Sequence, residues 1–188
     1  MKRIFIAINL PEKIKEELSN FQNKFLDLPA KWVRKENLHI TLVFLGYIRD
    51  DRFPKIIEIT KKVSSNYSSF PIKIIKISFF PPKVFPPRMI WAIGEKNETL
   101  FKLQKNLKNA LSEINIPQLE EEESGNFIPH ITLARIKKWE IKKIDPEEIP
   151  QIEEDIEIEF RANSIDIMES QLKRSGPEYI FLQKIPLL

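Results

Sequence analysis

The chain contains no cysteine among its 188 residues. This absence excludes a disulfide framework, a thiolate nucleophile and a cysteine-based zinc site, and it is typical of proteins from a reducing compartment. No segment approaches the roughly 20 consecutive apolar residues that a helix needs to cross a bilayer. We therefore expect a cytoplasmic protein without a membrane segment, and a monomer is the default expectation for its assembly.

Glycine and histidine are also scarce, with four and two residues. Charges of the two signs nearly cancel, because 30 Lys and Arg stand against 27 Asp and Glu and give a formal net charge of +3. This balance permits nucleic-acid binding but lacks the strongly basic footprint of a duplex-binding protein. The length suffices for one substantial core or for two small lobes that share an interface, so we expect a single domain over residues 1–188.

Hydrophobic periodicity divides the chain into strands and helices. Helical spacing of apolar residues predicts helices over residues 11–28, 51–65 and 97–114. Runs of β-branched and apolar residues predict strands over 4–10, 38–45, 70–78, 89–93 and 127–136, with two or three more within 156–168 and 178–185. An acidic loop is predicted at 120–125, whereas residues 137–150 are too charged and too rich in proline to assign.

The two histidines carry the strongest signal in the sequence. Both stand in the same segment, His-Ile-Thr-Leu, at 39–42 and at 130–133. At ordinary residue frequencies, a chance match of the three residues after a histidine has odds of roughly one in several thousand. Duplication or a shared function is therefore the better explanation.

Within a strand, side chains alternate between the two faces. His39 and Thr41 should therefore share one face, as should His130 and Thr132. If the apolar faces pack under helices, the two His-Thr faces meet in a shared cleft. We predict an α+β fold of two pseudo-symmetric lobes, with mainly antiparallel sheets, covering helices and a central cleft between the two histidine-bearing strands.

A matched pair of imidazoles suits acid/base chemistry at phosphorus. One neutral histidine can remove a proton from an attacking water, while a protonated one gives a proton to the departing ribose oxygen. Thr41 and Thr132 could donate hydrogen bonds to the phosphate oxygens. The identical motifs argue against a merely structural role for both histidines. Two histidines without a cysteine or a His-Glu-x-x-His pattern also make a poor zinc site, so we expect neither a metal nor a cofactor.

These motifs resemble those of the two-histidine (2H) phosphoesterase superfamily, and more closely those of the RNA 2′,3′-cyclic phosphodiesterases, also called 2′-5′ RNA ligase-like proteins. The resemblance covers residues 3–8, 37–46, 88–91, 127–135 and 169–170. It implies metal-independent hydrolysis of a terminal 2′,3′-cyclic phosphate on RNA, in tRNA fragments or small cyclic nucleotides, to a 2′-phosphate. It also implies that His39 is the proton donor and His130 the proton acceptor, an assignment that two identical motifs cannot make by themselves.

The resemblance adds Arg135 to the phosphate-binding residues Thr41 and Thr132, because an arginine follows the family's second motif and a guanidinium fork suits phosphate. Phe44 stands at the equivalent offset in the first motif, which predicts an asymmetric site. Strict alternation would turn Arg135 away from His130 unless a bulge redirects it, so a phosphate contact and a rim salt bridge both remain open.

Aromatic and basic residues near the motifs suggest how RNA could be held. Phe44, Trp91 and Phe80 are candidates for stacking on a terminal base, with core packing as the alternative for each. Cations that could attract a polyanion, or else lie on an ordinary solvated surface, are Lys31, Arg34, Lys35 and Arg88. Relatives often carry a basic residue where this chain has Gly125, so an RNA contact from that position is not expected.

Two alternative functions remain open on the sequence. The same acid and base could join RNA ends through a 2′-5′ bond, which is the reverse reaction. A non-catalytic module that binds RNA ends or nucleotides could also retain the cleft as a ligand pocket. Retention of both histidines and both threonines argues against a decayed site.

Overall fold

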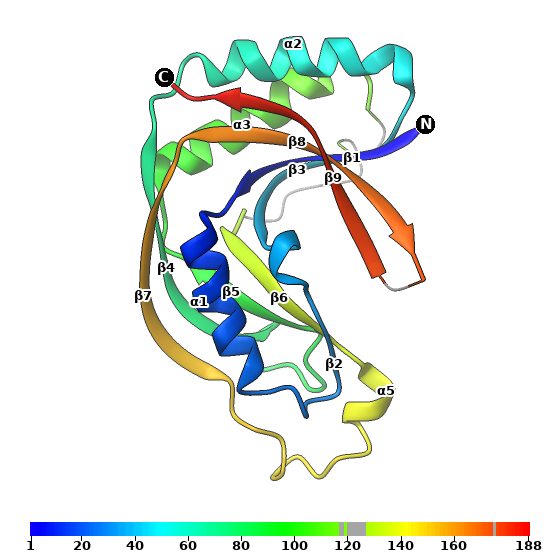
Figure 1. Cartoon of the computed structure of the whole chain (residues 1–188), viewed down its shortest axis with the longest axis vertical. Helices are drawn as coiled ribbons and strands as arrows, with labels where there is room; N and C mark the ends of the chain where they lie inside the picture. Colours follow the sequence, from blue (N-terminus) through cyan, green and yellow to red (C-terminus); the bar gives the residue numbers. More distant parts are fainter. Residues whose placement is uncertain (117–118, 120–126, 175) are drawn as a thin grey trace.

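A computed structural model describes residues 1–116, 119, 127–174 and 176–188 (Figure 1). The predicted acidic loop at 120–125, including Gly125, lies outside the described residues. Within these described residues, nine strands form one sheet in the order β7-β4-β5-β6-β3-β1-β8-β9, with β2 beside β6, and each pairing is antiparallel. The strands are β1 Lys2–Asn9, β2 Ala30–Trp32, β3 His39–Ile48, β4 Phe70–Phe80, β5 Met89–Gly94, β6 His130–Ile136, β7 Glu153–Ala162, β8 Ser164–Lys173 and β9 Gly176–Pro186.

Helices cover the sheet and connect its strands. The described helices are α1 Glu12–Asn23, α2 Phe53–Ser64, α3 Glu98–Ser112 and the short α5 Lys138–Ile141, with 3-10 turns η1 Lys35–Asn37 and η2 Asp50–Arg52. The three long helices confirm the helical spacing read from the sequence, although each is shorter than predicted. In the described part of the chain, no helix is long and apolar enough to cross a membrane.

The sheet divides into two lobes at a narrow junction. Between β3 and β6, the ladder contains one residue pair, Ile40 with Ile131. We call β3, β1, β8 and β9 lobe 1, and β6, β5, β4, β7 and β2 lobe 2. Figure 1 shows the sheet curling between them. This arrangement confirms the predicted two-lobed α+β fold and places the two histidine-bearing strands next to each other at its centre.

Each lobe is covered by a helix that follows a strand of the other lobe. Helix α1 follows β1 of lobe 1, yet its Leu18 and Phe21 lie beside Ile77 and Ile158 of lobe 2. Helix α3 follows β5 of lobe 2 and packs with α2 on lobe 1. This exchange ties the lobes together because each of these helices packs on the lobe that does not contain the strand before it.

The helix sequences explain their burial. Leucines recur in α3 at helical spacing, at positions 100, 103, 107 and 111, and all four are fully buried. The Asn97 side chain caps α3 by accepting a hydrogen bond from the backbone N–H of Leu100 at 2.9 Å. One apolar stripe with a polar opposite face is the pattern of a helix that covers a sheet.

The strand ends differ from the predictions at positions that concern the site. Both histidines are the first residues of their strands, since β3 begins at His39 and β6 at His130. The strand predicted over 38–45 does not end there but continues to Ile48, because Gly46 adopts the left-handed backbone conformation (φ 68°) within a bulge. The unassigned stretch 137–150 contains the short helix α5, and the final segments form three strands.

Candidate active site

The first His-Ile-Thr-Leu segment is followed by a β-bulge. Thr41 and Val43 of β3 pair with consecutive residues of β1, so Leu42 is an extra residue in the ladder. An extra residue reverses the alternation of the side chains beyond it. Phe44 therefore lies on the same face as Thr41, and both side chains line one pocket.

The second segment carries the same bulge. Thr132 and Ala134 of β6 pair with consecutive residues of β5, which makes Leu133 the extra residue. Arg135 consequently lies on the face of Thr132 and lines the pocket, and no described carboxylate forms an ion pair with it. The bulge turns the Arg135 side chain toward the pocket, whereas strict alternation would turn it away.

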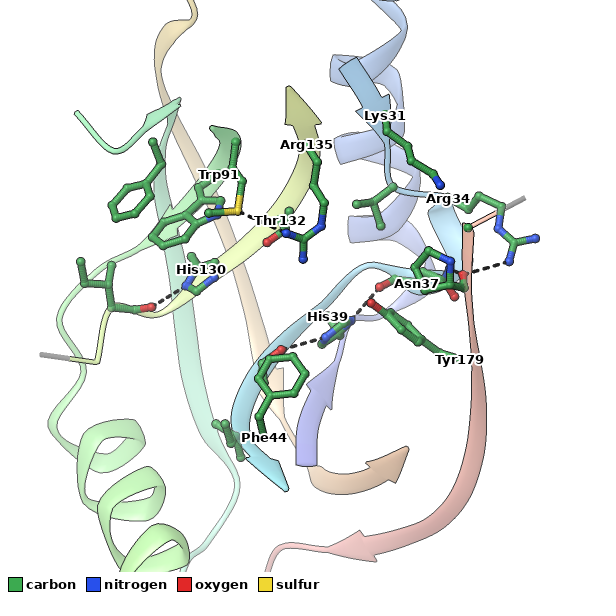
Figure 2. Close-up of a pocket in the computed structure, with 18 of the residues that line it drawn as sticks. Lys31, Arg34, Asn37, His39, Phe44, Trp91, His130, Thr132, Arg135 and Tyr179 are labelled. Carbon is green, nitrogen blue, oxygen red and sulfur yellow. Dashed lines mark hydrogen bonds between the residues drawn. The ribbon is translucent and has the colours of Figure 1, made fainter. Parts of the chain in front are cut away.

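Both imidazoles are anchored in the same way. The Nδ1 atom of His39 lies 2.7 Å from the carbonyl oxygen of Asn37, and that of His130 lies 2.7 Å from the carbonyl oxygen of Ile128. A carbonyl oxygen only accepts, so each Nδ1 carries a proton and donates it. Each neutral ring then offers an unprotonated Nε2 to the pocket, where the two rings approach from opposite lobes (Figure 2).

The surroundings of His39 are enclosed. Its Nε2 lies 2.9 Å from Oγ1 of Thr41, which can donate to the neutral ring. The ring centroid is 4.9 Å from that of Phe5 and 5.2 Å from that of Tyr179, whose ring meets it edge-on. Asn37 also donates from Nδ2 to the carbonyl oxygen of Pro177 at 3.0 Å, which holds the start of β9 against the site.

His130 belongs to a stack of three rings. Trp91 lies on it at a centroid distance of 3.6 Å and an angle of 16°, and Phe80 stacks on Trp91 at 3.5 Å and 12°. Trp91 thus packs against His130 and Phe80, as in the core-packing alternative for it, and its stacking on an RNA base stays a prediction. Phe80 uses one face for Trp91, and among the three aromatic candidates only Phe44 lies in the pocket without such a stacked neighbour.

Burial lowers the basicity of both histidines. It lowers the pKa of His39 to about 4, and the positive charges of protonated His130 and of Lys15 act in the same direction, whereas the bond to Asn37 opposes them. Burial also lowers the pKa of His130 below 6.5, and the charge of Arg135 adds to this effect. Both rings line the same pocket, so the charge of one opposes protonation of the other.

The pocket between the lobes has a volume of about 600 Å³ and is lined by cations. Lys31, Arg34, Lys108 and Arg135 contribute to its wall, and the described lining residues include no Asp or Glu. Arg34 also forms an ion pair with Glu36 at 3.4 Å, so Lys31 and Arg135 carry the argument that this wall favours an anionic ligand.

Two other predicted cations lie elsewhere. Lys35 forms ion pairs with Glu12 and Glu16 on the surface, and neither Lys35 nor Arg88 is among the described lining residues. Their proposed role beside the pocket is therefore not supported. Conversely, Tyr179 was not predicted, because an isolated tyrosine in the last strand belongs to no motif and only the curl of β9 brings it to His39.

In the described part of the chain, no group of three or more His, Cys, Asp or Glu is placed to hold a metal ion. The pocket offers two imidazoles, two hydroxyls and cationic side chains, a set that matches the charges and protons of phosphoester chemistry.

Comparison with known proteins identifies the class. The family described as LigT like Phosphoesterase matches residues 8–91 and 93–179, a range that includes both histidine motifs. The chain is thus an enzyme of the two-histidine phosphoesterase class. Within that class, it belongs to the LigT-like phosphoesterase family.

Two relatives named RNA 2′,3′-cyclic phosphodiesterase align over almost their whole length. The protein of Methanocaldococcus jannaschii is 33% identical over 177 residues, covering 94% of this chain and 96% of its own. The protein of Thermotoga maritima is 33% identical over 183 residues, covering 94% and 91%.

Two crystal structures share the fold. TT0787 of Thermus thermophilus superposes with a TM-score of 0.85 at 26% identity and covers 98% of this chain and 97% of its own. LigT of E. coli, complexed with phosphate, gives a TM-score of 0.75 at 21% identity over 99% and 97% of the chains. At that identity, the second comparison supports the fold alone.

Proposed function

We propose that the protein hydrolyses the 2′,3′-cyclic phosphate at the 3′ end of RNA and leaves a 2′-phosphate. The observation that carries this proposal is the pair of imidazoles, one from each lobe, that present Nε2 to one cationic pocket. The names of the relatives supply the substrate class. In this reaction, a water oxygen bonds to phosphorus while the bond from phosphorus to the ribose O3′ breaks.

His130 is proposed as the proton acceptor. Its pKa is lowered, so the ring is neutral near pH 7, and its Nε2 can take a proton from the attacking water. The stack with Trp91 and the bond to Ile128 hold the ring in one orientation. A fixed ring avoids the cost of orienting the base during the reaction.

His39 is proposed as the proton donor to O3′. Burial lowers the pKa of this ring to about 4, because the charged form is poorly solvated among its protein neighbours. A bound phosphate anion raises the pKa of an adjacent imidazole, since opposite charges favour the protonated form. The bound substrate thus favours the protonated form of His39, which then donates its proton to O3′. After the reaction His39 is neutral and His130 is protonated, and proton exchange with solvent restores the starting forms.

Thr41, Thr132 and Arg135 are proposed to bind the phosphate oxygens. The two hydroxyls follow the histidines on the same face of each strand. The Arg135 guanidinium donates to the Met89 sulfur at 3.8 Å, and its remaining N–H groups can donate to an anion in the pocket. These groups would stabilise the charge that develops on the phosphorane, and the mechanism would need no metal.

The test is turnover of an RNA oligonucleotide that ends in a 2′,3′-cyclic phosphate, in the presence of EDTA. We expect hydrolysis to a 2′-phosphate end, identified by its resistance to a 3′-specific phosphatase. Loss of activity in EDTA that a divalent ion restores would contradict the metal-free mechanism. Addition of an RNA with a 5′-hydroxyl would reveal end joining by the reverse reaction, and binding without any turnover would favour the non-catalytic alternative.

A further inference from the structure

The side of lobe 1 that faces the pocket continues beyond it. The isoleucines of β1 enter the main core, whereas Phe5 and Ala7 pack with Met168 and Tyr179 on the opposite side of the sheet. We call this opposite side the open face of lobe 1. Helices α2 and α3 lie on the core side, where α2 packs near β9 and α3 near β3.

A second bulge brings another aromatic residue to the open face. After Phe44, Leu45 is an extra residue opposite β1, and Gly46 supplies the left-handed backbone conformation that this bulge needs. Tyr47 then pairs directly with Arg3. Residues directly opposite each other in an antiparallel pair share a face of the sheet. Tyr47 and Arg3 therefore lie on the open face, beyond Phe44 as seen from the pocket.

Strand β9 extends the same surface on the other side. Phe181 pairs with Met168 and Lys184 pairs with Asp166, so both belong to the open face. Figure 2 shows that Tyr179, from the same strand, reaches the pocket beside His39.

Three aromatic side chains of this face are exposed. The exposed fractions are 39% for Phe44, 58% for Tyr47 and 51% for Phe181. Large apolar side chains gathered on an open sheet face mark a binding surface more often than isolated exposed ones do.

The charge of the face suits a polyanion. Arg3 and Lys184 contribute positive charge at positions among the aromatic residues. The described carboxylate on this face is Asp166, which is only 3% exposed and accepts hydrogen bonds from Asn9 at 2.7 Å and Ser164 at 3.3 Å. Asp166 therefore presents little negative charge to a ligand.

We propose that the open face of lobe 1 binds the single-stranded RNA that leads to the cyclic 3′ end, with bases stacked on Phe44, Tyr47 and Phe181. This inference rests on the proposed function and names its substrate as an oligonucleotide end. Four-stranded antiparallel sheets that carry exposed aromatic residues are established platforms for unpaired bases. Because Phe44 belongs to both the pocket and the face, a strand that enters the site passes directly onto this surface.

The experiment compares two substrates that share the reacting group. One is adenosine 2′,3′-cyclic phosphate, and the other is a six-nucleotide unstructured RNA with the same cyclic end. The parent should show a higher kcat/KM for the hexamer by roughly tenfold or more, since each base that stacks on an aromatic ring strengthens binding of the oligonucleotide. The Tyr47→Ala/Phe181→Ala double variant should lose most of this preference and retain mononucleotide turnover within about twofold.

Matched variants separate stacking from structural damage. Tyr47→Phe keeps the ring and should keep the hexamer preference, and Trp139→Ala, which removes an aromatic residue that is 78% exposed on α5, should not change it. In a plot of log kcat/KM against log salt concentration, Lys184→Gln should make the slope for the hexamer shallower by about 0.7. The slope for the mononucleotide should not change.

The outcomes distinguish the two proposals. If neither substrate is hydrolysed, the proposed function is wrong. If both are hydrolysed with equal kcat/KM, or if the double variant keeps the hexamer preference, the open face does not bind RNA although the proposed function stands. A parent dimer that becomes monomeric in the double variant, measured by sedimentation, would assign the face to a second copy of this chain instead.

Discussion

The two lobes place the same four residues, His-Ile-Thr-Leu, in different surroundings. Both histidines begin a strand, donate from Nδ1 to the carbonyl oxygen two residues earlier and precede a bulge at the leucine. In lobe 1, the ring lies among Phe5, Tyr179 and Thr41, and in lobe 2 it lies against Trp91. The repeated segment thus fixes the orientation of the rings, while their neighbours make the two halves of the site unequal.

The residue after each bulge adds a second difference. Lobe 1 presents Phe44 and lobe 2 presents Arg135 at the same offset from the histidine. One side of the pocket therefore offers an aromatic surface and the other a cation. This arrangement fits a substrate with a base on one side of its phosphate, and it would orient an otherwise symmetric pair of imidazoles.

The largest effect is expected when either lobe loses its imidazole. His39→Ala and His130→Ala should each reduce kcat by about 10²–10⁴-fold, because each removes one partner of a proton transfer. The double variant should lose less than the product of the single effects, since a lone acid or base already works poorly. Single-turnover rates on a cyclic-ended RNA measure this, and a variant with more than half of the parent rate would remove its histidine from the mechanism.

The pH dependence should reveal the unequal ionisation of the pair. The reactive form needs protonated His39 and neutral His130, and burial lowers both pKa values below 6.5 in the free protein. The kcat/KM should therefore fall by about tenfold per pH unit above pH 6.5, as His39 loses its proton. The kcat, which reports the bound state, should decline only at higher pH because the phosphate raises the pKa of His39. Superimposable profiles would contradict this difference.

The comparison of Arg135 with Phe44 predicts the next effect in size. Arg135→Ala should reduce kcat/KM by roughly 10–100-fold, because a charge-assisted hydrogen bond contributes about 1.5–3 kcal/mol. Arg135→Lys should recover only part of this loss, since it lacks the planar fork. Phe44→Ala should raise KM and leave kcat nearly unchanged. If Arg135→Ala and Phe44→Ala reduced kcat equally, the proposed division between a phosphate-binding cation in lobe 2 and a base-binding ring in lobe 1 would be contradicted.

A smaller effect is expected from the ring stack in lobe 2. Trp91→Leu removes the surface that covers one face of His130, so water gains access and the pKa of His130 rises toward its ordinary value of 6.5. The acid limb of kcat/KM should shift to higher pH, with a loss of a few-fold at the optimum. NMR titration of the histidine ring in both proteins measures the same change. An unaltered titration would show that Trp91 does not set this pKa.

The sequence predicted the parts of the site that depend on local pattern. Period-two alternation placed His39 with Thr41 and His130 with Thr132, and apolar spacing located the three long helices. The two bulges could not be predicted from the repeated segment, because an extra residue is defined by its partner strand. This is why strict alternation left the side of Arg135 undecided until the register with β5 was known.

The missed contacts are those made between distant segments. Tyr179 reaches His39 across 140 residues of sequence only because β9 lies at the edge of lobe 1 and Asn37 binds Pro177 at its start. The stack of Phe80, Trp91 and His130 combines three strands of lobe 2. The hydrophobic periodicity of one segment does not reveal contacts with another segment. For this reason, Phe80 and Trp91 are candidates for base stacking on the sequence alone, although they stack on each other in the fold.

The most direct test of the division between the lobes uses a substrate whose leaving atom needs no proton. In a cyclic phosphate with sulfur at the 3′ bridging position, the leaving thiolate has a conjugate acid of pKa about 8.5 and departs readily as an anion. His39→Ala should then act within about tenfold of the parent, whereas His130→Ala should remain slower by about 10²-fold or more. If His39→Ala is as impaired on the sulfur substrate as on the oxygen substrate, or if His130→Ala is the variant that recovers, the assignment of donor and acceptor is contradicted.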